Sequence, residues 1–327
     1  MLNPYELQVF LAAAEEESFS AAARRFHLTQ SAVSQQVHSL EQQLQVELFH
    51  RDGPRVSLTE NGRALMPMAR EYVHLSAHIE ESMAARQGMV TGQLTIGCTS
   101  TPGKYTLPWL VGSFCQKYPQ VKIAVEIVKR ADLVQKLEQQ AINFGIMSGQ
   151  VEHPDLIFDE FMQDDLVLIV PTQHPFAQQE VVSPEQLKGQ SVIFREEAAG
   201  TRIALLEGLE HSGVKREDLR VAPIELGAAE SIISAVEAGW GISWVSMVAA
   251  QRAVELGKIR LIEVEGLSVR RTIYLVRHQQ HASTEAHLKF YEFISSPAGQ
   301  AILRRLGVKG AGPAQSPALD RNSSRQV

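Results

Sequence analysis

The sequence has few of the features that mark a membrane, secreted or metal-binding protein. It contains only two cysteines, Cys98 and Cys115, which are too far apart for a CxxC motif. No apolar run reaches the roughly 18 residues that a transmembrane helix needs, and no basic segment followed by an apolar one opens the chain. Free cysteines in apolar contexts are usually core residues, although a redox pair is the alternative. We therefore expect a cytoplasmic protein with no membrane partner, no cofactor and no metal site.

Common catalytic and nucleotide-binding motifs are also missing. There is no GxSxG, GxGxxG, Walker or HExxH motif, and the eleven histidines are scattered without a ligand spacing. We therefore expect no catalytic residues and a protein that is not an enzyme.

Positive charge is scarce for a protein that binds nucleic acid. The formal net charge is -6, and the first ninety residues contain no lysine and seven arginines against eleven acids. Between Ser20 and Arg70, however, six arginines face only four acids. One surface can therefore be locally positive although the whole segment is acidic. The 327 residues, 44% of them hydrophobic, are typical of a globular protein with two or three domains.

The stretch from Ser18 to Leu58 predicts two helices joined by a tight turn and followed by a hairpin. Thr29 can cap the second helix, because its hydroxyl can accept from the free amides of the first turn. The apolar stripe of this helix consists of Val33, Val37, Leu40 and Leu44. Its opposite face carries groups that can donate and accept at base edges in a major groove: Gln30, Ser31, Ser34, Gln35 and His38. This arrangement is typical of a DNA-binding helix-turn-helix; a hairpin used only for packing is the alternative.

The hairpin after the second helix predicts a wing. Asp52, Gly53 and Pro54 form a turn signal between short apolar runs. Arg51 and Arg55 flank this turn and are placed to contact phosphates or the minor groove.

Several short motifs in this region resemble the N-terminal domain of the LysR-type transcriptional regulators. The motifs are Ala21-Ala22-Ala23, the LTQSAVS run from Leu28 to Ser34, Leu40-Glu41, Leu48-Phe49, Arg51 and the LTENG run from Leu58 to Gly62. The resemblance implies a winged helix-turn-helix, double-stranded DNA as partner, a homodimer or homotetramer, and indirect contact with RNA polymerase. Gln35 and His38 stand where the family often has basic residues, so the base preference is left open.

A long helix should follow from Thr59 to about Gln87. Apolar residues recur in it at spacings of three and four, close to a heptad seam. We expect a dimerisation surface, with packing on its own domain as the alternative. The seam residues are Leu65, Tyr72, Ile79 and Met83.

From Gln93 onward strands alternate with helices, which predicts βαβ units and parallel sheets. We expect separate strands at 156–161 and 166–170, and one closing helix at 283–306. The family resemblance implies a two-lobed α/β effector domain of the periplasmic-binding-protein type. The fold class is thus α+β multidomain: a winged helix-turn-helix at 1–58, a linker helix and hinge at 59–92, the effector domain at 93–306 with lobe I at 93–162 and 267–306 and lobe II at 163–266, and a disordered tail at 307–327.

Polar helix starts that follow strands mark a ligand site, because open α/β sheets bind ligands at the carboxyl ends of their strands. Hydroxyls, helix amides and a guanidinium suit a small anionic metabolite, although each hydroxyl alone can be only an N-cap. The expected effector contacts are Thr99, Ser100, Thr101, Met147, Ser148, Thr201, Arg202, Gly227 and Ala228. Ala199 and Ala228 stand where family members often have serine.

The stretch Ser100–Gly103, with Leu107-Pro108, is most similar to regulators of carbon fixation and of cysteine or sulfur assimilation. The expected function is therefore a sequence-specific, DNA-binding transcriptional regulator modulated by a small anionic metabolite between two lobes. Two alternatives are a solute-binding protein, which would not need the helix-turn-helix, and an enzyme on the same fold, which would need a catalytic pair in the cleft.

Overall fold

The computed structural model describes residues 2–52, 55–279 and 284–310, without the side chains of residues 51, 52 and 55. The chain divides into two compact units. The first contains residues 1–92, 139–141 and 282–285, and the second contains 93–138, 142–281 and 286–327. None of the helices in the described ranges could span a lipid bilayer. The expected turn at Gly53-Pro54 and residues 311–327 of the expected tail lie outside the described residues.

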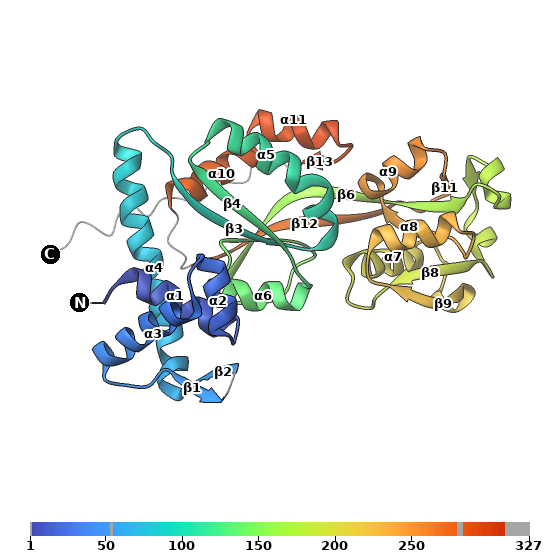
Figure 1. Cartoon of the computed structure of the whole chain (residues 1–327). Helices are drawn as coiled ribbons and strands as arrows, with labels where there is room; N and C mark the ends of the chain where they lie inside the picture. Colours follow the sequence, from blue (N-terminus) through green and yellow to red (C-terminus); the bar gives the residue numbers. More distant parts are fainter. Residues whose placement is uncertain (1, 53–54, 280–283, 311–327) are drawn as a thin grey trace. The chain divides into compact units, whose positions relative to one another are not determined.

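The first unit is a helical domain with a two-stranded wing (Figure 1). Thr29 is an N-cap as predicted, and Thr59 caps the helix that begins after it: their hydroxyls accept from the backbone amides of Ala32 and Gly62 at 3.2 and 3.0 Å. His27 adopts a left-handed conformation, with φ of 54°, and makes the tight turn between the first two helices of the motif. The elements are α1 (Pro4–Glu15), α2 (Phe19–Phe26), α3 (Gln30–Leu44), β1 (Phe49–Asp52), β2 (Arg55–Leu58) and α4 (Glu60–Arg86).

The core of this unit lies where the apolar stripe of α3 meets α1. Val33, Val37 and Leu40 are fully buried. Glu41 is also buried, and its carboxylate accepts from the Leu48 backbone amide at 2.9 Å, which fixes the approach to the wing. Leu65 packs against this core. Leu65 therefore does not lie on the exposed surface that we expected to form the dimer seam, because the first turns of α4 pack against their own domain.

The second unit is built on a nine-stranded sheet with strand order β4-β3-β5-β12-β6-β11-β7, in which β10 and β13 also pair with β6. Its two lobes share the long strands β6 (Leu156–Pro171) and β12 (Val269–His278), which run from one lobe to the other (Figure 1). The prediction of two strands at 156–161 and 166–170 was wrong, because β6 keeps an antiparallel partner along its whole length.

Lobe I carries a parallel pair of strands flanked by helices, and lobe II carries a second parallel pair, β8 with β9. The further elements of lobe I are β3 (Gly92–Cys98), a π-helical turn η1 (Pro102–Thr106), α5 (Leu107–Lys117), β4 (Val121–Ile127), α6 (Arg130–Glu138) and β5 (Phe144–Ser148). Lobe II adds η2 (Pro175–Gln178), β7 (Val181–Val182), η3 (Pro184–Leu187), β8 (Ser191–Arg195), α7 (Gly200–His211), η4 (Arg216–Asp218), β9 (Arg220–Leu226), α8 (Ala229–Glu237), β10 (Ser243–Ser246), α9 (Met247–Glu255) and β11 (Ile259–Val264).

The C-terminal part differs from the expectation in two ways. The single closing helix is in fact two, α10 (Glu285–Ser295) and α11 (Pro297–Arg305), because Pro297 lacks an amide hydrogen and starts a new helix capped by Ser296. The expected disordered tail begins with ordered residues: β13 (Lys309–Gly310) pairs with β6, and Val308 is buried.

Candidate functional site

The polar face predicted for DNA binding lies on α3 and is accessible. Gln30, Ser31, Gln35 and His38 are exposed and Ser34 is half-buried, while the apolar stripe faces the core. The His38 side chain is 60% exposed, and its Nε2 lies 3.0 Å from the Gln42 amide nitrogen. The helix therefore presents amides, hydroxyls and an imidazole to solvent along one surface. Arg51 and Arg55 belong to strands β1 and β2, but their side chains lie outside the described residues.

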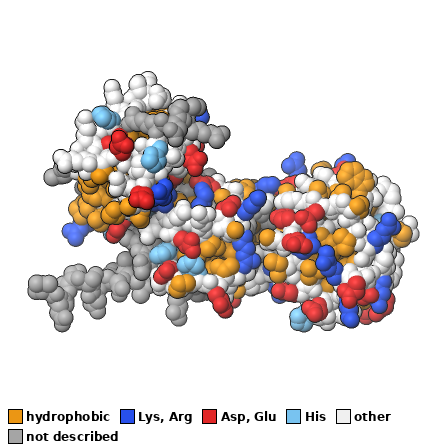
Figure 2. Space-filling view, turned by 90° about the horizontal axis from the view of Figure 1, so that it is seen from below, with side chains coloured by type: hydrophobic (Ala, Val, Ile, Leu, Met, Phe, Trp, Pro, Cys, Tyr) orange, Lys and Arg blue, Asp and Glu red, His pale blue; other side chains and the backbone are white. Residues whose placement is uncertain are grey.

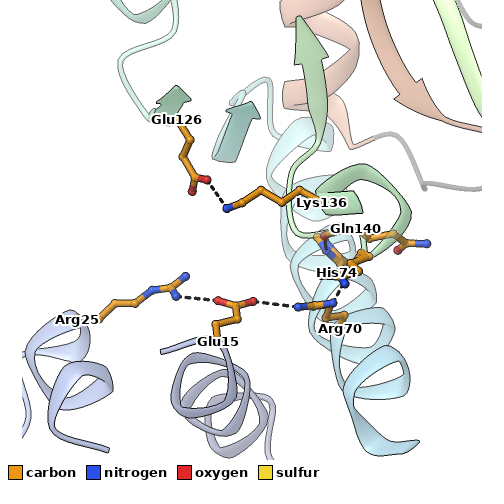
Figure 3. Close-up of polar contacts among 8 residues, drawn as sticks. Glu15, Arg25, Arg70, His74, Glu126, Lys136 and Gln140 are labelled. Atoms are coloured by element: carbon orange, nitrogen blue, oxygen red, sulfur yellow. Dashed lines mark hydrogen bonds and ion pairs between the residues drawn. The ribbon is translucent and has the colours of Figure 1, made fainter. Parts of the chain in front are cut away.

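Two arginines that contribute to the local positive charge of the first unit are engaged internally. Arg25 Nη1 lies 2.9 Å from Glu15 Oε2, and Arg70 Nη2 lies 3.2 Å from Glu15 Oε1 (Figure 3). Arg70 is buried and also donates to the Gln139 carbonyl, which clusters with this unit. The count of arginines in the sequence therefore overstates the charge available for phosphates.

An exposed apolar row follows α4 beyond the helix-turn-helix core. Tyr72 is 38% exposed, and Ile79 and Met83 are 54% and 50% exposed. Met68 and Leu75 complete the row at helical spacing. Three of the four residues expected in the seam thus lie on one exposed face, and Leu65 does not.

A cavity of about 860 Å³ lies between the two lobes of the second unit. Its walls come from residues that directly follow parallel strands: Thr99–Thr101 after β3, Ser148 at the end of β5, Glu196–Ala199 after β8, and Gly227-Ala228 after β9. The carboxyl ends of the parallel strands in both lobes therefore meet at one cleft, as the topology requires.

Two helices begin at this cleft without a capping side chain. The N-caps of α7 and α8 are Ala199 and Ala228, and neither makes a side-chain hydrogen bond to the first turn. Side chains cap α1, α2, α3, α4 and α11, whereas α5 and α9 also begin without a side-chain cap. The free amides and the positive end of the dipole at α7 and α8 are therefore available to an anion in the cleft.

A buried ion pair connects the crossing strands beneath the cavity. Arg271 on β12 lies opposite Asp164 on β6, with Arg271 Nη2 2.6 Å from Asp164 Oδ2. Arg271 Nη1 donates to the Thr201 hydroxyl at 2.9 Å, and the Asp164 carboxylate accepts from Ser246. Arg271 Nη2 makes no hydrogen bond of good geometry. The guanidinium thus lines the cleft with its charge paired to Asp164.

Seven of the nine residues expected to contact the effector line this cavity; Met147 and Arg202 do not. Met147 is fully buried in the lobe I core, because its side chain points away from the cleft-facing end of β5. Arg202 donates to Glu225 at 2.7 Å and to the Arg195 carbonyl at 2.9 Å. Its guanidinium is therefore used inside lobe II.

Sequence reasoning missed the cations that do line the cavity, which are Lys104, Lys129, Arg130, Arg195 and Arg271. They outnumber the lining acids Glu196, Glu197 and Glu225. Arg195 is paired bidentately with Glu196, and over the face of this unit seen in Figure 2 side chains of both charges lie interspersed. Arg271 lies within β12, and the rule that ligand contacts follow the ends of strands does not predict a residue inside a strand.

The two cysteines have environments that disfavour a thiolate. Cys98 is fully buried, and desolvation raises the pKa of its thiol to about 12. Burial also raises the pKa of Cys115, which is partly exposed. A thiol that stays protonated at neutral pH is a poor nucleophile and reacts slowly with oxidants.

Comparison with known proteins agrees with both units. Residues 5–63 match the family described as "Bacterial regulatory helix-turn-helix protein, lysR family", and residues 87–297 match the "LysR substrate binding domain". The chain is 31% identical over 299 residues to the RuBisCO operon transcriptional regulator of Allochromatium vinosum, covering 91% of this chain and 97% of that protein.

Solved structures show the same fold. A full-length OxyR variant from Pseudomonas aeruginosa superposes with a TM-score of 0.69 at 21% identity, covering 98% of this chain and 99% of that one. The regulatory domain of Synechocystis PCC6803 CcmR in complex with 2-PG superposes with a TM-score of 0.55 at 25% identity, covering 62% and 96%. The two family matches together span most of the sequence, and the chain belongs to the LysR family of transcriptional regulators.

Proposed function

We propose that this chain is a transcriptional regulator whose interlobe cleft binds a small anionic metabolite. The observation that carries the proposal is the pair of uncapped helix N-termini, α7 and α8, that begin at one cavity beside the Arg271 guanidinium. Free amides, hydroxyls and a guanidinium hold a carboxylate or a phosphate by charge-assisted hydrogen bonds. A metal ion needs electron-pair donors as ligands and would not use the amide and guanidinium hydrogens of this set.

In this proposal the first unit binds DNA. The exposed face of α3 reads base edges, and a homodimer formed through the exposed row on α4 places two such helices on inverted half-sites. Pairing of effector domains extends the dimer to a tetramer. Metabolite binding changes the arrangement of the lobes, and through it the bound DNA and its contact with RNA polymerase. The ligand can shift the equilibrium between two arrangements of the lobes only if it binds them with unequal affinity. The coupling free energy between ligand binding and DNA binding in such systems is about 1–3 kcal/mol.

The names of two similar proteins support a class of metabolite. The relative from Allochromatium vinosum is named for the RuBisCO operon, and the CcmR domain was solved with 2-PG, a small phosphate-bearing acid. We infer that the ligand of this chain belongs to the same chemical class of small phosphorylated or carboxylated metabolites.

A titration of the full chain tests this proposal. Calorimetry with sulfate, phosphate and 2-phosphoglycolate compares the wild type with Ser100→Ala/Ser148→Ala, which removes two hydroxyls from the cavity wall. We expect binding to the wild type and an affinity lower by about tenfold in the double variant, as for the loss of a hydrogen bond to a charged group. Ser234→Ala, an exposed position on α8 outside the cavity, is the control. Equal affinity in all three proteins would place the anion elsewhere.

A further inference from the structure

A salt bridge joins the two lobes at the mouth of the cleft. Lys104 in η1 of lobe I lies 3.0 Å from Glu230 Oε1 in the first turn of α8 in lobe II. Both side chains remain partly exposed, at 37% and 41%. Lys104 also lines the 860 Å³ cavity, so the cation that Glu230 holds is one that a bound ligand can reach.

The residue after Lys104 strengthens this link. Tyr105 belongs to lobe I but packs against the lobe II core cluster that contains Ala229 and Ile233. Tyr105 thus places a second lobe I side chain beside the first turn of α8. Burial and the neighbouring Glu230 charge raise the pKa of Tyr105, so that it remains a neutral hydrogen-bond donor.

Glu230 adds a negative charge of the protein's own near the N-terminus of α8. Ala228 offers no capping group, and the Glu230 carboxylate belongs to the first turn of the helix. Burial acts to raise the pKa of Glu230, but the nearby backbone amide, Lys104 and Tyr105 outweigh it and hold the pKa below its ordinary value. The side chain therefore supplies a negative charge to a helix N-terminus and to Lys104 at the same time.

We propose that Glu230 is an internal competitor of the effector: its carboxylate occupies Lys104 until a second anionic group of a bound metabolite takes that cation. This inference rests on the proposed function, because it concerns the same cleft. It narrows the ligand class to metabolites with two anionic groups. One group binds at the floor beside Ser148 and Arg271, and the other replaces Glu230 at Lys104. When the metabolite binds, the direct salt bridge between Lys104 and Glu230 is lost, and the metabolite connects the two lobes instead.

Glu230→Gln tests the competition, because it removes the charge and keeps the shape. The matched control is Glu237→Gln on the same helix, whose carboxylate pairs with Lys258 at 3.2 Å inside lobe II. In calorimetry of the full chain, Glu230→Gln should bind 2-phosphoglycolate about fivefold more tightly than the wild type. This factor corresponds to the upper end of the free energies that partly exposed ion pairs contribute. Its affinity for inorganic phosphate, which has one anionic group for the floor, should stay unchanged, as should both affinities of the control.

Equal tightening for phosphate and 2-phosphoglycolate would overturn the proposal, because it would show a general effect of charge. No tightening, in a chain that does bind 2-phosphoglycolate, would overturn it as well. A wild type that binds neither anion would count against the proposed function instead. A measurement without ligand then tests whether Glu230 holds the two lobes together. Amide hydrogen exchange at 102–106 should be faster in Glu230→Gln than in Glu237→Gln. Equal rates would exclude a role of the Lys104–Glu230 pair in joining the lobes.

Discussion

Ser148 at the end of β5 and Gly200 at the start of α7 touch across the cleft, so closely that a Cβ on residue 200 would overlap the Ser148 hydroxyl. The contact joins lobe I to lobe II at the floor of the cavity. Glycine is required there for space, because a methyl group would have to displace Ser148 or separate the lobes. The observed arrangement of the lobes therefore depends on the absence of one side chain.

Gly200→Ala should consequently destabilise this arrangement. We expect a loss of about 1–3 kcal/mol in unfolding free energy from overpacking, measured by urea denaturation. Ser148→Gly in the same chain should restore most of the loss, since it removes the atoms that clash. Gly227→Ala is the control, because no atom lies within 4 Å of a Cβ at that position. Losses of equal size at 200 and 227 would mean that the contact between Ser148 and Gly200 is not responsible.

Gln35→Ala should relax the base preference of DNA binding at one or two positions. A lost bidentate contact to a base edge costs about 1–3 kcal/mol of discrimination. Selection from random DNA, followed by affinity measurements on the selected sites, gives the preference. Gln36→Ala is the matched control, because Gln36 lies outside the predicted contact face of α3. An unchanged preference in Gln35→Ala would mean that α3 enters the groove in another orientation.

The double variant Tyr72→Glu/Ile79→Glu should disrupt dimerisation through α4. Both residues belong to the exposed row on this helix, where charges would face each other across a two-fold axis. Sedimentation should show monomers, and DNA affinity should fall at least about 100-fold as the second half-site contact is lost. Circular dichroism checks that the helix content is kept. A double variant that remains dimeric would place the interface on another surface.

His174 should make the stability of lobe II sensitive to pH. Its Nδ1 accepts from the Phe176 amide at 3.2 Å, which requires an unprotonated nitrogen. Burial lowers the pKa of His174 below its ordinary value of 6.5. As the pH falls below 6.5, the unfolded chain takes up a proton before the folded one does, so stability decreases. His174→Asn keeps an acceptor without the titration, and urea unfolding between pH 7.5 and 5 should show a smaller decrease than in the wild type. Equal decreases would assign the pH dependence to other groups.

The sequence was informative where a local pattern decides the structure. Thr29, Thr59 and the Val33–Val37–Leu40 stripe could be predicted because caps and helical periodicity depend on neighbours along the chain. The hydroxyls of the cleft could be located because each follows a strand. The roles of residues that depend on partners far away in the chain could not be predicted from local sequence patterns. Arg202 has the chemistry of an anion ligand, but Glu225 and the Arg195 carbonyl engage it.

Arg271 shows the opposite case. Its place opposite Asp164 results from the register of two strands that are more than a hundred residues apart. Ala199 and Ala228 lack the hydroxyls that family members often have at these positions. Their position as N-caps leaves amides free for a ligand, and this depends on where each helix begins.

The central claim is that an anion in the cleft changes how the chain binds DNA. The most direct measurement is a nuclease footprint on the bound DNA, with and without a panel of small carboxylates and phosphates that includes 2-phosphoglycolate. We predict that at least one anion with two charged groups changes the footprint of the wild type and leaves that of Ser100→Ala/Ser148→Ala unchanged at the same concentration, while both proteins bind DNA equally without ligand. Identical footprints of the wild type across the whole panel, or an equal response in both proteins, would contradict the account.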